Sequence, residues 1–193
     1  MAENPVRNKV EYGLKNVYYA IVSLVDGVAV YGTPKHIPGA VSLALPPQGE
    51  MVKFEADNID YYVSLDNRGY AGTIGFALIP DEFKVDVLGE TFDETTGVQT
   101  EHADAKLNAF ALLFQFEGDK KAIRHVLYNC YAGRSEMASG TNRGATPNTN
   151  TLNIEALPRE TDNVVKRKTT EKTTETVYNS WFTEVFNPEV PEV

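Results

Sequence analysis

The chain of 193 residues has little of what disulfide, metal or membrane sites require. Its one cysteine, Cys130, excludes an intramolecular disulfide and stands in a strand-like pattern that predicts a buried structural thiol. The three histidines, His36, His102 and His125, lie too far apart for a metal-ligand spacing. No apolar run approaches the roughly 20 residues of a membrane span, and the polar N-terminus is unlike a secretory signal. We therefore expect folding in a reducing, bacterial cytoplasm.

Motifs for catalysis or cofactor binding are missing as well. The sequence contains no P-loop, no His-Glu-x-x-His, no Cys-x-x-Cys and no Gly-x-Ser-x-Gly. Gly69, Gly72 and Gly75 do not have the spacing of the dinucleotide fingerprint, and in a strand they predict a bulge or a close backbone approach. His125 is predicted to be a hydrogen-bonded structural histidine. We expect no enzymatic activity, no cofactor and no metal.

Positive charge is scarce. The 18 lysines and arginines face 27 acidic residues, which gives a net charge of −9, and most of the excess acid lies in the first hundred residues. An acidic chain does not bind nucleic acid by neutralising phosphates, and the basic run at residues 166–168 is too short to form a groove. The charge suits a surface that nucleic acid passes without being held.

What the sequence does contain is period-two alternation of apolar residues, the pattern of β-strands. The central example is residues 110–132, read as a hairpin with Phe110, Leu112, Phe114 and Phe116 on one face. Both faces of this hairpin are largely apolar, so we expect both to be covered, either by the same chain or by another copy.

The other predicted elements give a mainly β fold, a sandwich or barrel in a single domain of residues 1–193. One short helix is expected from about Asp81 to Leu88, with Asp81 as its cap and Gly89 as its stop. A second short helix is expected at residues 178–186. Further strands are expected at residues 17–25, 28–31, 40–45, 70–79, 151–157 and 164–168.

Three segments are expected to lie outside this framework. Residues 1–16 form a polar N-terminal arm, and residues 133–150 form a flexible loop rich in Gly, Ser, Thr and Asn. Residues 46–64 combine acidic with aromatic side chains, which is unlike an ordinary solvated loop. One interpretation is a hairpin with one wet face; the other is an extended loop that docks on a neighbouring subunit.

Several blocks, in order along nearly the whole chain, resemble the major tail (tail tube) proteins of long-tailed, non-contractile (siphovirus) phages of Gram-positive bacteria. Residues 133–148 resemble none of the family's blocks. The resembling blocks are residues 12–17 (YGLKNV), 38–41 (PGAV), 56–59 (ADNI), 61–63 (YYV), 77–83 (ALIPDEF), 87–89 (VLG), 110–114 (FALLF), 118–121 (GDKK), 124–130 (RHVLYNC) and 178–182 (YNSWF).

The resemblance implies a tail-tube-type β-sandwich that assembles into stacked hexameric rings around an inner β-barrel. The implied partners are further copies of the chain, the tape-measure protein, and the tail terminator and distal tail proteins. The genome passes through the lumen without specific binding, no membrane is involved, and the protein resides in the virion after assembly in the host cytoplasm. The hypothetical subunit-interface residues are Glu50, Phe54, Asp57, Asn58, Ile59, Tyr61, Tyr62, Trp181 and Phe182.

Alternatives from other classes remain open. A monomeric β-sandwich binding module for a carbohydrate or receptor would show an exposed aromatic platform. Within phage biology, a head–tail joining or decoration protein is close to the tail-tube reading. A hydrolase or transferase on a β scaffold ranks third, because no nucleophile–base or metal set is visible.

Overall fold

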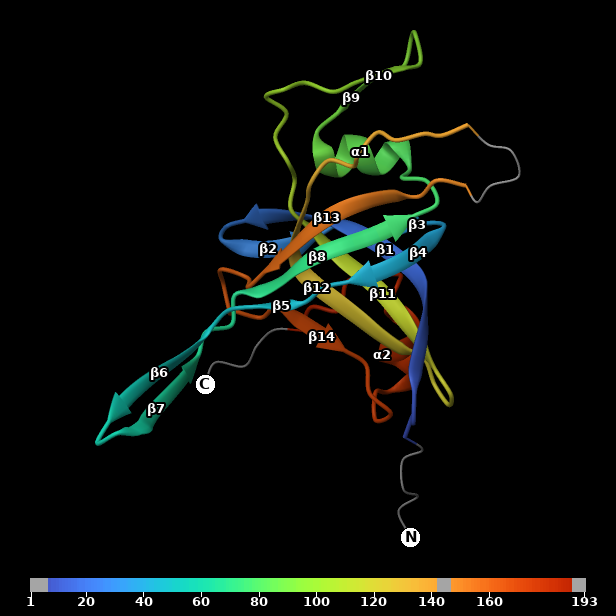
Figure 1. Cartoon of the computed structure of the whole chain (residues 1–193). Helices are drawn as coiled ribbons and strands as arrows, with labels where there is room; N and C mark the ends of the chain where they lie inside the picture. Colours follow the sequence, from blue (N-terminus) through green and yellow to red (C-terminus); the bar gives the residue numbers. More distant parts are fainter. Residues whose placement is uncertain (1–6, 142–146, 189–193) are drawn as a thin grey trace.

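The structure, a computed structural model, describes residues 7–141 and 147–188. Figure 1 shows a curled β-sheet with one helix packed at one end and a long hairpin projecting from the other. The predicted mainly β fold with two short helices is confirmed.

The principal sheet is antiparallel throughout. Its order is β2-β1-β11-β12-β13-β8-β4, and three short strands, β3, β14 and β5, pair with β1, β12 and β8. The bounds are β1 (Glu11–Val25), β2 (Val28–Tyr31), β3 (Lys35–Ile37), β4 (Ala40–Ala44), β5 (Pro47–Gln48), β8 (Gly69–Phe76), β11 (Phe110–Gly118), β12 (Ile123–Ala132), β13 (Asn150–Leu157) and β14 (Lys166–Lys168).

The two ends of this sheet are brought together by a very short connection. β3 lies on β1 at one end and β4 lies on β8 at the other, yet only Pro38 and Gly39 separate them. Gly39 has a φ of 75°, which glycine adopts without strain. Among the described residues no ladder joins β4 to β1, so the sheet is curled but not closed.

The central hairpin of β11 and β12 is covered on both faces, as predicted, and both covers come from the same chain. The inner face carries Phe110 and Leu112 into a core shared with α1 (Asp81–Leu88). The outer face carries Leu113 and Tyr128 into a second cluster with Trp181, which follows α2 (Glu175–Ser180). The buried thiol prediction is also confirmed: Cys130 is fully buried, and burial raises its pKa to about 12.

Helix α1 has the predicted bounds but a different N-terminal cap. Pro80 occupies the cap position and no side chain caps the helix, whereas Asp81 lies inside it and pairs with Lys84 at 2.8 Å. The predicted stop is confirmed, because Gly89 takes the left-handed conformation at a φ of 75°. Phe83, together with the other buried residues of the helix, faces the inner core.

The predicted N-terminal arm is wrong for its second half. Strand β1 begins at Glu11 and pairs with the far end of β11, with Glu11 opposite Gly118. Two register shifts interrupt this ladder, and Gly13 and Asn16 have positive φ angles of 64° and 51°. These irregularities break the period-two pattern, which hid the strand in the sequence. Residues 1–6 lie outside the described part.

The second helix also differs from its prediction. It runs over Glu175–Ser180 rather than residues 178–186. Beyond it the chain bends, and Trp181 and Phe186 stack with ring centroids 5.4 Å apart. The aromatic spacing therefore reflects a folded-back segment on the outer face of the sheet and not one face of a helix.

The glycines of β8 mark close backbone approaches, as predicted. A Cβ added at Gly72 would lie 2.0 Å from the carbonyl oxygen of Ala44 in the β4 segment. A Cβ at Gly69 would lie 2.0 Å from the carbonyl oxygen of Ala156 in β13. Only glycine permits both neighbours to come this close.

The remaining segments are short. β9 (Thr91–Asp93) and β10 (Val98–Thr100) form a small separate hairpin whose turn contains Thr96 and Gly97. Residues 133–141 and 147–149 have no regular structure, in line with the predicted loop, and residues 142–146 lie outside the described part. In the part of the chain that is described, no helix has the length and apolar character to cross a bilayer.

Candidate subunit interface

The acidic and aromatic segment forms a hairpin that stands away from the body of the protein (Figure 1). It consists of β6 (Met51–Ala56) and β7 (Ile59–Leu65), joined by the turn residues Asp57 and Asn58. Their φ angles of 54° and 61° suit a two-residue hairpin turn. The hairpin interpretation is therefore confirmed, but its expected single wet face is wrong, since residues on both faces are exposed.

The register assigns the side chains to faces. Phe54 lies opposite Tyr62, so these two aromatic rings share one face with Val52, two residues before Phe54. Lys53 lies on the other face, where it forms an ion pair with Asp60. One hairpin face is thus apolar and aromatic, and the other is mixed.

The exposure of large hydrophobic side chains along this hairpin is high. Eight of them have between 48% and 71% of their surface accessible: Met51, Val52, Phe54, Ile59, Tyr61, Tyr62, Val63 and Leu65. Each strand pairs only with the other, so both outer edges are free of ladder partners within the described chain. Contiguous exposed apolar surface with open strand edges is typical of a surface that another protein covers.

The β6–β7 ladder is separate from the principal sheet, and two backbone hydrogen bonds bridge the strands at the base of the hairpin. The carbonyl oxygen of Glu50 accepts a hydrogen bond from the N–H of Asp66 at 3.0 Å, and that of Gln48 accepts one from Arg68 at 3.1 Å. Gly49 makes the closest passage: a Cβ there would lie 1.7 Å from the carbonyl oxygen of Asp66. The hairpin is accordingly a ribbon that extends from β5 and β8.

Charge on the hairpin is predominantly acidic. Asp60 pairs with Lys53, and Asp66 pairs with Arg68. Three more carboxylates make no ion pair within the described part: Glu50, Glu55 and Asp57. The exposed ribbon thus presents uncompensated negative charge beside its apolar face.

The last two hypothetical interface residues lie elsewhere. Trp181 is only 2% exposed, and its indole N–H donates to the carbonyl oxygen of His125 at 3.3 Å. Phe182 is half-buried and stacks on Tyr18 at 4.9 Å. Trp181 is part of the protomer's own outer core, so its side chain is not offered to a neighbour. The aromatic pattern of the sequence does not show whether Trp181 covers the sheet of its own chain or that of another copy.

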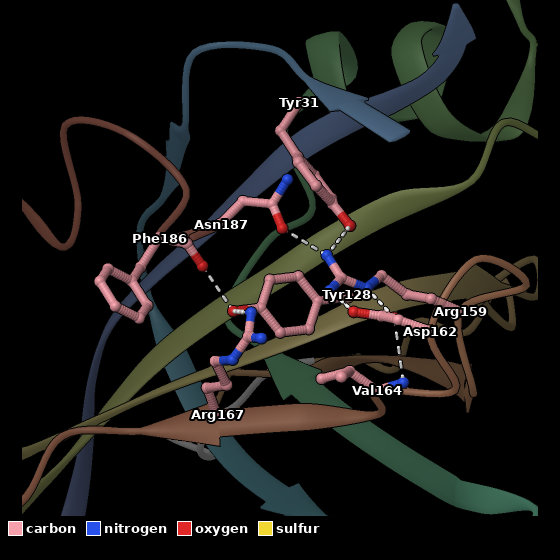
Figure 2. Close-up of polar contacts among 8 residues, drawn as sticks. All are labelled: Tyr31, Tyr128, Arg159, Asp162, Val164, Arg167, Phe186 and Asn187. Atoms are coloured by element: carbon pink, nitrogen blue, oxygen red, sulfur yellow. Dashed lines mark hydrogen bonds and ion pairs between the residues drawn. The ribbon is translucent and has the colours of Figure 1, made fainter. Parts of the chain in front are cut away.

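A polar network, which the sequence pattern did not reveal, holds the C-terminal segment on the outer face (Figure 2). The guanidinium of Arg159 is bidentate to Asp162 and also reaches Tyr31 and Asn187. Burial disfavours ionisation of Asp162, but hydrogen bonds from Arg159 and from a backbone N–H keep its pKa below the ordinary value. The hydroxyl of Tyr128 donates to the carbonyl oxygen of Phe186 at 2.5 Å. The partners are too distant in sequence to form a motif.

A cleft of about 170 Å³ lies beside the part of β12 that pairs with β14 instead of β13. One wall comes from Leu45 and Tyr70, at the β4–β5 and β8 side, and the other from Phe114 and His125 of β11 and β12. The imidazole Nε2 of His125 is buried and has no hydrogen-bond partner among the described residues, so the predicted hydrogen bond is not found there. Burial, followed by the charges of two lysines of β14, lowers the pKa of His125 to about 4.

Comparison with known proteins yields little. No protein-family model matches the chain, and no curated protein matches it. Among solved structures, the cryo-EM structure of the anti-feeding prophage cap, a tube-terminating cap, has a TM-score of 0.46 and 10% sequence identity. The alignment covers 88% of this chain and 99% of that chain. Because the TM-score is below 0.5, this likeness establishes neither a shared fold nor a shared function.

Proposed function

We propose that this chain is a structural virion protein, a subunit of a phage tail. More specifically, it polymerises as stacked hexameric rings into the tail tube that conducts the genome to the host. The observation that carries the proposal is the β6–β7 hairpin, whose eight exposed hydrophobic side chains require a partner surface. The ordered blocks that resemble tail-tube proteins supply the kind of assembly, and one of those blocks forms the hairpin turn at Asp57 and Asn58.

The proposed partners follow from that role. Further copies of the chain form the ring, the tape-measure protein occupies the growing lumen, and terminator and distal tail proteins close the ends. The net charge of −9 suits a lumen through which DNA moves without being bound. Assembly takes place in the host cytoplasm, the protein is part of the virion, and it has no catalytic role.

The test is the assembly state of the purified full-length chain. Light scattering after size-exclusion chromatography and negative-stain microscopy should show rings or hollow tubes. Replacing residues 51–65 with a short turn should leave a folded monomer that forms neither. The control shortens the β9–β10 hairpin, which is also exposed, and should assemble normally. A full-length chain that stays monomeric at high concentration contradicts the proposal, as does normal assembly without the β6–β7 hairpin.

A second candidate function has one observation in its favour. Tyr61 and Tyr62 are exposed aromatic residues, the kind of platform on which carbohydrate-binding modules stack sugar rings. This alternative predicts a stable monomer that binds glycans or a receptor. A glycan array with the full chain and with a Tyr61→Ser, Tyr62→Ser variant separates the two, because only the binding module should lose signal on that substitution.

A further inference from the structure

The principal sheet has one end strand whose outer edge is open and uncharged. β2 (residues 28–31, VAVY) pairs only with β1 within the described chain, and none of its residues carries a charge. Val28 and Val30 are 60% and 44% exposed, and Leu24 and Val25 at the adjoining end of β1 are 64% and 52% exposed. An edge strand with apolar side chains and no charge lacks the usual protection against pairing with another strand.

The ladder shows which backbone groups of β2 are free. Directly after the last ladder pair of β2, the N–H of Gly32 donates to the carbonyl oxygen of Ile21 at 2.9 Å. Hydrogen-bonded and non-hydrogen-bonded pairs alternate in an antiparallel ladder, so the N–H and C=O groups of Ala29 and Tyr31 point away from β1. These groups have no backbone partner in the described part of the chain.

A groove of about 360 Å³ runs beside this edge. One wall is β2 with Gly32, and the other is the segment that follows α2, including Thr183 and Val185. Neighbouring strands in a sheet lie about 4.8 Å apart. A strand that enters the groove therefore lies beside Ala29 and Tyr31, which line it.

The other edges of the principal sheet are less suited to pairing. β4, at the far end of the strand order, lies close to β1 of the same chain, so its edge is turned toward its own protomer. β14 consists of Lys166, Arg167 and Lys168, and charged side chains on an edge strand oppose pairing with another strand. β3 and β5 have only three and two residues. Within the described chain, β2 is the edge that best accepts a further strand.

The β6–β7 hairpin carries a second open edge of the same character. The N–H of Asp66 donates to the carbonyl oxygen of Glu50, and the alternation along the ladder directs the backbone groups of Val63 and Leu65 away from β6. Residues 61–65 (YYVSL) carry no charge, whereas β6 contains a lysine and a glutamate. The eight exposed hydrophobic side chains of the hairpin offer ~100 Å² each, which together approach the ~800 Å² that each partner buries in a standard interface.

We propose that β7 of a second copy of this chain, through residues 61–65, adds as an antiparallel strand to the free edge of β2. Every ladder within the described chain is antiparallel, and the added strand places aromatic and branched side chains next to Val28 and Val30. The hairpin of one copy and the β2 edge of the next are different surfaces, so the contact is head-to-tail, the arrangement that can close into rings. This inference rests on the proposed self-assembly and names the receiving surface.

The first test maps the contact with cysteines. The alternation of pairs places Val30 opposite Tyr62 or Ser64 of the added strand, depending on the register. A chain with Val30→Cys is mixed with one that carries Tyr62→Cys or Ser64→Cys; the native Cys130 is fully buried. After assembly and mild oxidation, mass spectrometry should find a disulfide between the two copies in one of the two mixtures. Val98→Cys, on the exposed β9–β10 hairpin, is the control partner, and yields no higher than with this partner would overturn the docking.

The second test changes the β2 edge itself. Ala29→Pro deletes an N–H that points away from β1, so the β1–β2 ladder is kept, and the concentration needed for assembly should rise about tenfold. Val28→Lys places a charge on the same edge and should act similarly. The matched control Val98→Lys makes this change at an exposed valine of β10 and should have no effect.

Thermal unfolding of each variant verifies that a lost assembly is not a lost fold. If Ala29→Pro lowers the melting temperature, Val28→Lys decides alone, because its side chain is 60% exposed. Assembly of the folded edge variants at the wild-type concentration would contradict the proposal.

The outcomes also separate the two levels of inference. If the full-length chain assembles but neither the cross-links nor the edge variants implicate β2, the receiving surface is wrong and the tail role stands. If the chain does not assemble at all, both are wrong.

Discussion

The imidazole of His125 lies parallel to the ring of Phe114, with centroids 5.0 Å apart and an angle of 2° between the planes. Phe116 packs against the same imidazole at 5.1 Å. These two aromatic rings exclude water from the imidazole, which disfavours its protonated form. The positive charges of the two lysines of β14 disfavour that form further. The folded chain therefore keeps this histidine neutral over most of the accessible pH range.

This burial predicts an acid-sensitive fold. The pKa of His125 is about 4 in the folded chain and about 6.5 in an unfolded one. Between these values the unfolded state binds the extra proton, so stability falls as pH decreases from about 6.5, by about 2 kcal/mol at pH 5. Urea unfolding at pH 7, 6 and 5 measures this loss. His125→Phe should flatten the profile in that range, whereas His102→Gln, at an exposed site, should leave it unchanged.

The Arg159–Asp162 pair predicts a large stability effect from a single truncation. The Arg159 side chain is 6% exposed and that of Asp162 is 15% exposed. Arg159→Ala leaves a carboxylate buried without its partner and should reduce the free energy of unfolding by about 3–5 kcal/mol. The exposed pair of Arg134 with Glu101 is the control, and Arg134→Ala should leave the free energy of unfolding nearly unchanged, because water screens this pair. Similar losses for the two variants in urea unfolding would refute this account of the network.

The close approach of β4 to its neighbour β8 predicts that the fold does not tolerate an added methyl group at Gly72. Gly72→Ala would place a Cβ at 2.0 Å from the Ala44 carbonyl oxygen, so one strand must move. We expect a loss of about 1–3 kcal/mol, measured by thermal unfolding. Gly140→Ala meets nothing within 4 Å and serves as the control, with no measurable change expected. An unchanged melting temperature for Gly72→Ala would show that the strands are not held together this tightly.

The exposed hairpin predicts a variant that separates folding from assembly. Phe54 is 60% exposed in the single chain, so Phe54→Ser should change the free energy of unfolding by no more than about 0.5 kcal/mol. The same substitution should prevent or strongly weaken assembly measured by light scattering. Phe92→Ser, on the β9–β10 hairpin and also exposed, should affect neither property. Assembly of the Phe54 variant at the wild-type concentration would remove this residue from the interface.

Local patterns predicted much of the fold because their causes are local. The bounds of α1 followed from the sequence between Pro80 and Gly89, and the double cover of the central hairpin followed from two apolar faces. The start of β1 was missed because two bulges disturb its alternation. Periodicity predicts which side chains share a face, but it does not reveal what covers that face, so Trp181 was assigned to an interface that its own chain occupies.

The candidate site was predicted in part. Composition singled out residues 46–64, but only the three-dimensional structure shows a ribbon with two exposed faces. The cleft and the Arg159 network bring together residues from distant strands and loops. No spacing along the sequence predicts that these residues are in contact. Sites of this kind depend on topology, which a pattern of strands leaves open.

Residues at the base of the β6–β7 hairpin also form one wall of the cleft beside His125. Leu45 and Tyr70 line the cleft, and Tyr70 pairs with Pro47 in the short β5–β8 ladder from which the hairpin extends. Leu45 and Tyr70 also pack against the inner core of their own chain, so the base of the hairpin is fixed before any partner arrives, and little freedom of that base is lost when the exposed side chains of the hairpin become covered.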